Sequence, residues 1–194
     1  MTSVKGLNPA DQDLAVDVIV RAFSKDPVAQ WFYPELEQYR EYFPKFVRAF
    51  AGAAFAHGRV HCIDGFLGAA LWLAPGAHVD GDILASLLQQ SIGENRKAEA
   101  FALIEQMEQR HPSEAHWYLP MIGVDPAHHS QGYGSALLKH ALARCDRAGK
   151  PSYLEASSTA SARLYERHGF EPLGTIQVGS SPPLFPMLRR PRPN

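Results

Sequence analysis

A glycine-rich segment in the second half of the chain carries the most specific chemical signal in the sequence. An apolar stretch that ends at Val124 is followed by a turn sequence with Gly132 and Gly134, and then at once by residues with helical periodicity. Backbone N–H groups in such a turn point into one concavity, and the amino-terminal end of the helix adds partial positive charge there. The segment therefore predicts a site for a phosphate or a pyrophosphate group.

Two familiar phosphate-binding motifs do not fit this segment. The P-loop requires Lys followed by Ser or Thr after its last glycine, whereas Ser135 and Ala136 follow Gly134. The dinucleotide fingerprint requires a third glycine where this chain has Leu137. It also requires an acidic strand end about 20 residues further on, where the sequence is still helical. A dinucleotide-dependent oxidoreductase is therefore disfavoured.

A second motif lies between residues 157 and 170. Its informative residues are Ser158, Ser161, Leu164, Tyr165, Gly169 and Phe170. Together the two segments resemble the GNAT superfamily of N-acetyltransferases, whose acetyl-CoA loop has the pattern Gln/Arg-x-x-Gly-x-Gly/Ala. The second signature of that superfamily is Asn-x-x-Ala-x-x-Leu-Tyr-x-x-x-Gly-Phe. The resemblance covers residues from about 116 to 170.

The chain departs from the superfamily patterns at two positions. His129 stands where the loop prefers Gln or Arg, and Ser158 stands at the Asn position. A second register of the loop motif, from Gln131 to Ala136, matches the letters but shifts the helix by two residues, so we take the first. The substitutions leave room for a different class of function, a non-catalytic acyl-CoA-binding or sensing module on the same fold.

The resemblance implies one domain over residues 1–194, of the α/β (α+β) class. We expect a mixed, mostly antiparallel central sheet of six to seven strands, with helices on both faces and a V-shaped splay at the acetyl-CoA site. Residues 1–115 would supply mainly the acceptor side and the first strands. Residues 116–170 would form the acetyl-CoA-binding core, and residues 171–194 the last strands and the tail. The runs 117–126, 154–157 and 182–187 are similar to the subgroup that contains puromycin N-acetyltransferase.

The resemblance also implies acetyl-CoA as the cofactor, held mostly by main-chain groups. The strand before the loop would pair with the pantetheine arm, and the loop would bind the pyrophosphate. The residues assigned to the cofactor are Ile122, Gly123, Val124, His129, Ser130, Gln131, Gly132, Tyr133, Gly134, Ser135 and Ser158.

Acetyl transfer to an amine needs a proton acceptor for the amine and a proton donor for the leaving thiolate. A phenol with a reference pKa of ~10 is protonated at neutral pH and can donate to a thiolate whose reference value is ~8.5, so we predict Tyr165 as the general acid. Glu155 lies at the end of an otherwise apolar strand and is the predicted general base. In some GNAT enzymes a Glu on this strand has that role. His116 and Tyr118 are weaker alternatives that share one side of the preceding strand.

The expected acceptor is a primary amine of a small molecule or peptide, attacking directly in a ternary complex. GNAT enzymes usually place acceptor contacts on the first two helices, where this chain has an aromatic run that includes Trp31 and Tyr33. That run could wall the acceptor pocket or belong to the core. Asp26 could attract an ammonium group or simply end a helix, and Tyr118 is a further candidate contact.

Hydrophobic periodicity and turn residues indicate the elements that must hold these side chains. A helix should start at Asn8-Pro9 and end at Lys25-Asp26-Pro27, before a break at the aromatic run. Further helices are expected over residues 35–56 with a kink or boundary at Pro44, 80–109 divided at Ile92-Gly93, 134–147 and 159–167. Strands are expected over 60–63 and 66–73 with a primed Asp64-Gly65 turn, 117–124, 153–156, 170–178 and 184–188. Pro186 favours an edge position for the last strand, and the Arg-rich tail is expected to be frayed and solvated.

The composition is that of an ordinary globular protein. Of 194 residues, 45% are hydrophobic and 20% charged, and the net charge of −1 gives no footprint for nucleic acid or an anionic membrane. The sequence has no apolar run long enough to span a bilayer and no signal-peptide pattern. Two cysteines and nine histidines without metal-ligand spacing predict buried thiols and no metal site. We therefore expect a cytoplasmic protein, and the resemblance implies that it is an enzyme and allows a homodimer.

Overall fold

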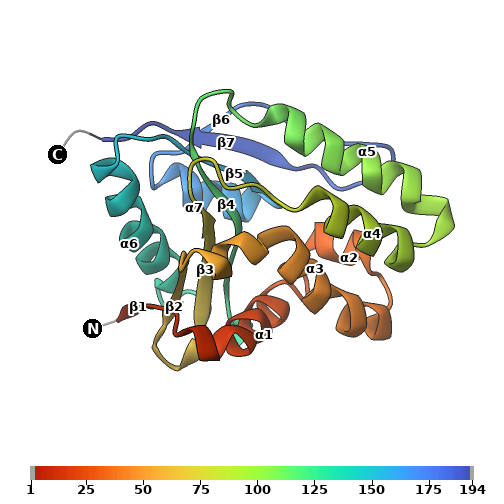
Figure 1. Cartoon of the computed structure of the whole chain (residues 1–194), viewed down its shortest axis with the longest axis horizontal. Helices are drawn as coiled ribbons and strands as arrows, with labels where there is room; N and C mark the ends of the chain where they lie inside the picture. Colours follow the sequence, from red (N-terminus) through yellow and green to blue (C-terminus); the bar gives the residue numbers. More distant parts are fainter. Residues whose placement is uncertain (1–2, 193–194) are drawn as a thin grey trace.

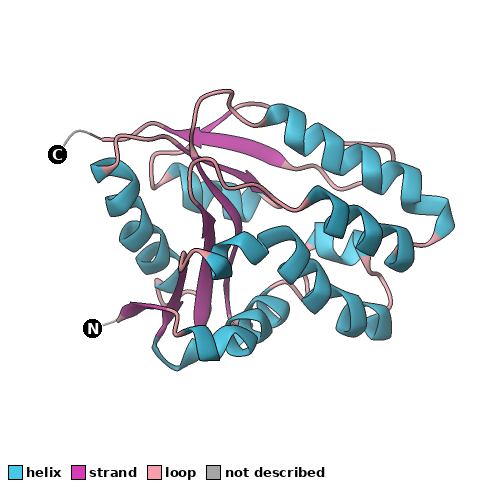
Figure 2. Cartoon of the chain, viewed as in Figure 1, coloured by secondary structure: helices cyan, strands magenta, loops and turns pink. Residues whose placement is uncertain are grey.

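Seven strands form one mostly antiparallel sheet in the computed structural model, which describes residues 3–192 (Figures 1 and 2). Its strands are β1 (Val4–Gly6), β2 (Val60–Ile63), β3 (Gly68–Leu73), β4 (Trp117–Val124), β5 (Ser152–Ala156), β6 (Glu171–Pro172) and β7 (Phe185–Arg189). They lie in the order β1-β2-β3-β4-β5-β7-β6, and only β4 and β5 run parallel. The expected fold class is confirmed.

Helices cover both faces of the sheet. They are α1 (Gln12–Ala22), α2 (Pro27–Phe32), α3 (Leu36–Ala56), α4 (Gly81–Ser91), α5 (Glu94–Arg110), α6 (Tyr133–Arg147) and α7 (Thr159–Glu166). α1 and α3 contact β3 and β4, while α6 packs on β2, β3 and β4 from the opposite side (Figure 1). None of the described helices is long and apolar enough to cross a membrane.

The alternation of side chains along β3 explains why there are two cores. Ala69, Leu71 and Leu73 join the core beneath α1, α3, α4 and α5. Ala70 and Trp72 join the core beneath α6. Successive residues of a strand point to opposite faces, so an all-apolar strand such as β3 must be covered on both sides.

The sheet opens between its two parallel strands. β4 and β5 pair only through Trp117 with Ser152 and Tyr118 with Tyr153, although β4 continues to Val124. A β-bulge lies just beyond, because Leu73 pairs with Tyr118 and Leu71 with Met121, which leaves two residues of β4 opposite one of β3. From the bulge onward, β4 has no strand partner on its β5 side within residues 3–192.

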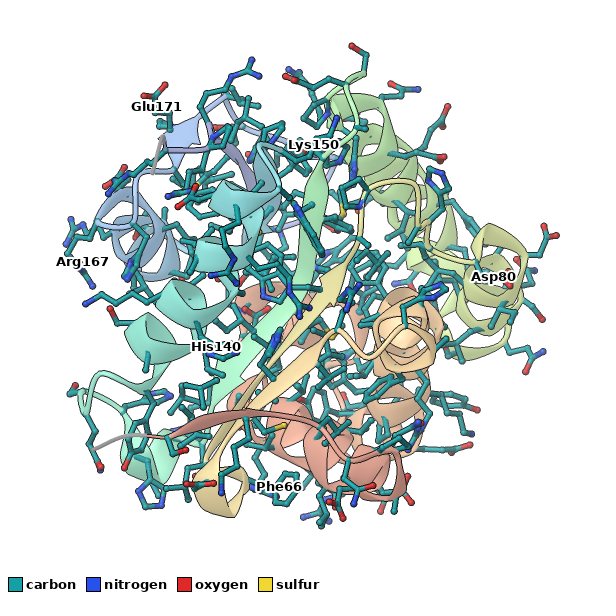
Figure 3. The ribbon with its side chains drawn as sticks, turned by 60° about the vertical axis from the view of Figure 1, so that its left-hand side comes forward. Phe66, Asp80, His140, Lys150, Arg167 and Glu171 are labelled. Carbon is teal, nitrogen blue, oxygen red and sulfur yellow. The ribbon has the colours of Figure 1, made fainter. Side chains whose placement is uncertain are left out.

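The connection between β2 and β3 corrects one expectation. The Asp64-Gly65 pair does not form a two-residue primed turn; residues 64–67 connect the strands through a 3-10 turn (Asp64–Phe66). Gly65 and Phe66 both have positive φ values, 74° and 54°, so the reversal uses two left-handed residues. Phe66 marks this end of the molecule in Figure 3, and Lys150 marks the other.

Three features of the first half of the chain refine the expected elements. α3 runs through Pro44 without a boundary, because the lost hydrogen bond is outweighed by an aromatic face that packs on both sides of it. The chain breaks at residues 33–35, as expected, but Trp31 and Phe32 belong to a short helix that was not expected, α2, whose amino terminus is capped by Asp26. β1 was not expected, since three residues at a sheet edge carry no readable periodicity.

The carboxy-terminal third also differs. The expected strand 170–178 reduces to β6 and a single bridge between Ile176 and Leu184, with Gly174 and Gly179 at positive φ in the intervening chain. β7 is not an edge strand, because it lies between β5 and β6. The Pro186 carbonyl accepts from the Leu173 amide on the β6 side. The N–H that proline lacks would point to the same side, toward the short strand β6, so Pro186 is tolerated there.

The Arg-rich end is held in place rather than frayed. The Arg189 guanidinium, with 4% of the side chain exposed, donates to both carboxylate oxygens of Asp146 at 2.7 and 2.8 Å and to the His168 carbonyl. The Arg192 amide donates to the same carboxylate, and Arg190 pairs with Glu114. Pro193 and Asn194 lie outside the described residues.

Candidate active site

A cavity of about 830 Å³ occupies the opening between β4 and β5. β4, the glycine-rich loop, the start of α6 and α7 form one side of it, and α1, α2, α3 and α5 form the other. The cavity therefore brings together residues from both halves of the chain.

The glycine-rich loop presents main-chain donors to this cavity. Ser130 and Gly132 adopt left-handed conformations, with φ values of 63° and 80°, and no side chain caps the amino terminus of α6 at Gly132. The first amides of a helix have no partner within the helix, and the helix dipole places positive charge there. The loop residues that line the cavity are His128, His129, Ser130, Gly132, Tyr133, Gly134 and Ser135.

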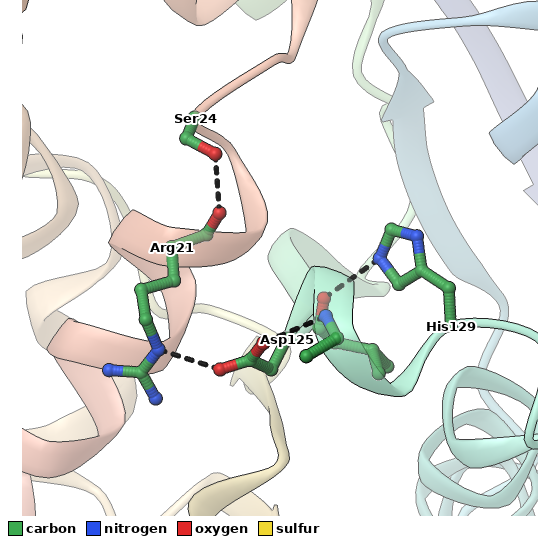
Figure 4. A network of polar contacts seen from close by, with 6 residues as sticks. Arg21, Ser24, Asp125 and His129 are labelled. Carbon is green, nitrogen blue, oxygen red and sulfur yellow. Dashed lines mark hydrogen bonds and ion pairs between the residues drawn. The ribbon is translucent and has the colours of Figure 1, made fainter.

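Polar contacts fix the start of this loop against α1 (Figure 4). Asp125 accepts from the Ala127 amide at 3.0 Å and from Arg21 Nε at 2.7 Å, and these two contacts lower the pKa of its carboxyl. His129 Nε2 donates to the Val124 carbonyl at 3.0 Å. His129 thus holds the strand end, which is a different role from a phosphate contact.

The predicted main-chain sites for pantetheine lie on the free side of the opening. Ile122, Gly123 and Val124 all line the cavity. Gly123 has a second constraint, because a Cβ at this position would lie 2.5 Å from the Cβ of Ala22. Only glycine lets α1 pack this closely on β4.

Ser158 begins α7 with a reciprocal capping box. Its hydroxyl accepts from the Ser161 amide at 3.1 Å, and the Ser161 hydroxyl lies 3.2 Å from the Ser158 amide. Both residues line the cavity. A serine in place of the usual asparagine therefore keeps the helix start intact.

Tyr165 of α7 lines the cavity. Its ring packs against Phe170 in the core beneath α6 and α7, and its hydroxyl makes no hydrogen bond within residues 3–192. Burial, and then the negative charge of Asp26, raise the pKa of the phenol well above its usual value. The hydroxyl is a protonated, uncommitted donor at neutral pH.

Asp26 caps a helix and also lines the cavity. Its Oδ1 atom accepts from the amides of Val28 and Ala29 at 3.0 Å, which caps α2. Its Oδ2 atom accepts from the Ser157 hydroxyl, and the residue lines the cavity. Burial raises the pKa of this carboxyl, although the three hydrogen bonds oppose the shift.

Glu155 is a buried wall residue rather than a solvated strand end, with 3% of its side chain exposed. Its Oε2 atom accepts from the Tyr118 hydroxyl at 2.9 Å, and its Oε1 atom lies 3.5 Å from His111 Nε2. Desolvation and the Glu155 charge hold the pKa of Tyr118 well above its usual value, so this phenol stays a donor. Tyr118 positions Glu155 and does not itself line the cavity.

The wall of the cavity formed by the helices of the first half and α5 is apolar, and apart from Phe32, which belongs to the predicted aromatic run, it was missed in the sequence. It is lined by Phe23, Phe32, Phe43, Phe46, Phe50, Ile104 and Met107. Phe43, Phe46 and Phe50 recur at helical spacing, but such a stripe equally describes a helix that faces a core. Only the packing of α3 across the opening distinguishes the two.

Besides Tyr118 and the weaker alternative His116, three predicted residues are not brought to the cavity. Tyr33 is fully buried in the core and pairs with the Ser91 hydroxyl at 3.1 Å. Trp31 faces away and its Nε1 donates to Ser180 at 3.1 Å. Gln131 points outward at the loop tip, where its amide lies 3.5 Å from His128. Trp31 and Tyr33 point away from the cavity because the helical turn at the end of α2 directs Phe32, which lies between them in the sequence, into it.

Comparisons with known proteins agree with this arrangement. The model of the Acetyltransferase (GNAT) family matches residues 28–170. The chain belongs to this family. The matched range contains the glycine-rich loop, β5 and α7, and residues of all three line the cavity.

Individual relatives of this GNAT domain extend over its whole length. An uncharacterized N-acetyltransferase of Schizosaccharomyces pombe, C550.08, is 27% identical over 206 aligned residues, which cover 97% of this chain and 83% of that protein. A structure described as histone acetyltransferase HPA2 and related acetyltransferase from Corynebacterium glutamicum has a TM-score of 0.71 at 27% identity, covering 100% and 98% of the two chains. Mosquito arylalkylamine N-acetyltransferase-like 5b shares the fold, with a TM-score of 0.68 at 13% identity and coverage of 98% and 100%.

Proposed function

We propose that this GNAT protein is an acetyl-CoA-dependent N-acetyltransferase that acetylates a primary amine of a small molecule or peptide by direct attack in a ternary complex. The observation that carries the proposal is the shared cavity. It places an uncapped helix start, a free strand edge, the Tyr165 hydroxyl and the Asp26 carboxylate around one space.

The residues present fit acetyl-CoA on two structural grounds. The loop from Ser130 to Ser135 and the amino terminus of α6 offer main-chain N–H groups and a positive dipole to a pyrophosphate. Beyond Tyr118, β4 lacks a strand partner on the cavity side in the described chain, so Ile122 to Val124 can pair with an extended, amide-containing arm. The bound thioester would supply the activated acetyl group.

The side chains then divide the proton chemistry. Tyr165 donates a hydrogen bond, and then its proton, toward the sulfur of the leaving thiolate, and it recovers a proton from the amine nitrogen as that nitrogen becomes an amide. Glu155 takes up the proton that the acceptor ammonium must lose, directly or through one water. Holding both reactants in one cavity contributes much of the rate by raising their effective concentration.

The acceptor side favours an amine that carries an apolar or aromatic group. Phe43, Phe46 and Phe50 provide an apolar wall, and Asp26 provides the only carboxylate on that side that lines the cavity among residues 3–192. An ammonium group is attracted to a partly desolvated carboxylate, while its apolar substituent gains from leaving water. We propose that Asp26 orients the amine while the phenylalanines bind its substituent.

Thermal unfolding with and without acetyl-CoA tests donor binding, and a thiol-release assay over a panel of amines tests transfer. We expect millimolar acetyl-CoA to raise Tm, because a ligand that binds the folded state stabilises it, and NAD or ATP to have little effect. Phenylalkyl amines should be better acceptors than small hydrophilic ones. An unchanged Tm would count against the GNAT donor site itself.

Asp26→Asn tests the acceptor side separately. Asparagine still caps α2, so the fold should persist, but the KM for the amine should rise about tenfold with the loss of one charge-assisted contact. If acetyl-CoA binds tightly and no amine in the panel releases thiol, the protein is better described as an acyl-CoA-binding or sensing module.

A further inference from the structure

A chain of titratable groups leads from the cavity wall to the surface on the far side of Glu155. Glu155 Oε1 lies 3.5 Å from His111 Nε2, and His111 Nδ1 lies 3.1 Å from His116 Nε2. His116 Nδ1 in turn lies 2.8 Å from the Glu114 carbonyl. Side-chain exposure rises from 3% at Glu155 to 26% at His111, and His116 is also partly exposed.

The Glu114 carbonyl assigns the proton positions along this chain. A carbonyl can only accept, so His116 carries its proton on Nδ1 and leaves Nε2 as an acceptor. His111 must then donate from Nδ1 to His116. A neutral His111 therefore presents an unprotonated Nε2 to Glu155.

No proton therefore lies between Glu155 Oε1 and His111 Nε2 to form a hydrogen bond. A carboxylate oxygen and an unprotonated Nε2 cannot share a hydrogen bond, and Glu155 Oε1, 3.5 Å from His111 Nε2, has no hydrogen bond within the described residues. A single proton placed on either atom would complete the chain. The arrangement suits a site that receives one proton per reaction and passes it on.

We propose that Glu155, His111 and His116 form a proton path that carries the proton lost by the amine acceptor from the cavity to the surface. This proposal rests on the proposed function, because the amine that is acetylated is the source of the proton. His111 and His116 are not catalytic residues in this proposal, because they act through Glu155 and do not line the cavity.

The transfer balances in four steps. The ammonium gives a proton to the Glu155 carboxylate, and the resulting O–H gives it to His111 Nε2. The Nδ1 proton of His111 passes to His116 Nε2, and the Nδ1 proton of His116 leaves to water or a buffer base. Proton exchange between each partly exposed ring and water restores the starting tautomers without net transfer.

The surroundings hold His111 without offering it a competing acid or base. The rings of Tyr118 and Tyr153 lie 4.5 and 4.6 Å from its ring, and both phenols have raised pKa values and stay protonated. Arg110 precedes it on α5, and the Glu114 carboxylate is paired with Arg190. Desolvation lowers the pKa of His116, so this ring gives up its extra proton readily.

His111→Gln and His116→Gln test the path, because glutamine keeps a hydrogen-bonding side chain but cannot carry a proton. We expect kcat to fall about tenfold or more in each, with the KM for acetyl-CoA unchanged. Added imidazole should restore part of the rate and make it depend on buffer concentration, whereas the native rate should not. His78→Gln, at an exposed position outside this chain of groups, is the matched control.

The tautomers can be measured without any acetylation. Long-range proton–nitrogen NMR spectra of the ligand-free protein should show both His111 and His116 protonated at Nδ1. A proton on His111 Nε2 would overturn the path even if the protein acetylates amines, and so would His111→Gln variants with native kcat and no response to imidazole. If no amine is acetylated, the proposed function fails while the tautomers still decide the proton chain.

Discussion

At the scale of single residues, burial decides what each side chain in the cavity can do. Tyr165 and Tyr118 are both phenols, but Tyr118 is committed to Glu155 while the Tyr165 hydroxyl is free. Asp26 is held by three hydrogen bonds and still faces the cavity. The proposed function therefore assigns different roles to the two phenols, with Tyr165 as a proton donor and Tyr118 as a positioning group.

Tyr165→Phe should separate chemistry from cofactor binding. Phenylalanine fills the same space, so Tm and the Kd for acetyl-CoA should change little, whereas kcat should fall about 100-fold with the loss of the proton donor. The raised pKa of Tyr165 also predicts no alkaline loss of kcat from this group below pH 10. A thiol-release assay measures kcat, and calorimetric titration measures the Kd for acetyl-CoA.

Tyr42→Phe provides the matched control, since Tyr42 lies on α3 outside the cavity lining. It should retain native kcat. A Tyr165→Phe variant with native turnover would remove this residue from the mechanism.

At the scale of elements, the approach of α1 to β4 shapes the opening of the sheet. Gly123 permits that approach, and the Arg21–Asp125 contact fixes the loop that follows β4 onto the same helix (Figure 4). The helix and the strand thus position the loop jointly. A change at their contact should affect both stability and the cofactor site.

Gly123→Ala should destabilise the protein by about 1–3 kcal/mol, because its Cβ would overlap that of Ala22 and push α1 away. Affinity for acetyl-CoA should fall as well, since the β4 edge moves. Chemical denaturation and calorimetry measure both effects.

Gly52→Ala is the opposite case within α3. A Cβ there meets no atom within 4 Å, so alanine should stabilise the helix by about 0.5–1 kcal/mol. A Gly123→Ala variant as stable as Gly52→Ala would contradict the close contact between α1 and β4 at Gly123.

At the scale of the whole molecule, the carboxy-terminal segment closes the fold by returning to α6. Asp146 near the end of α6 receives two hydrogen bonds from Arg189 of β7 and one from the Arg192 amide. Arg189 also donates to the carbonyl that follows α7. This buried ion pair joins the last strand to the crossover helix.

Asp146→Asn should cost about 3 kcal/mol, because it leaves the buried Arg189 charge without a partner. The Arg189 hydrogen bonds lower the pKa of Asp146 below its ordinary value of 3.8. The native pair therefore contributes its full stability above about pH 4 and loses it as the pH falls through the lowered value. Denaturant unfolding between pH 2 and 7 should show this acid loss in the native protein and less of it in the variant.

Glu114→Gln is the control, because the Glu114–Arg190 pair is exposed on both sides. It should cost less than about 1 kcal/mol and leave the acid dependence unchanged. A similar loss in the two variants would contradict the special role of the buried pair.

The sequence by itself determined the parts of this protein that depend on local spacing. The glycine pattern before α6, the Leu-Tyr and Gly-Phe pairs around α7, and the apolar runs of β3 and β4 predicted the family, the sheet and the cofactor side of the site. Interactions between neighbours along the chain dominate in such segments, so their periodicity and turn residues can be recognised without the fold.

Tertiary structure decided the rest, because those features depend on contacts between distant segments. Whether Phe43 or Tyr33 faces the cavity follows from how α2 and α3 cross the opening, and both patterns look like core helices in one dimension. The approach of His111 to Glu155 and of Arg189 to Asp146 likewise joins segments separated by more than 40 positions. No local periodicity encodes such a pairing, since its energy exists only once the chain has packed.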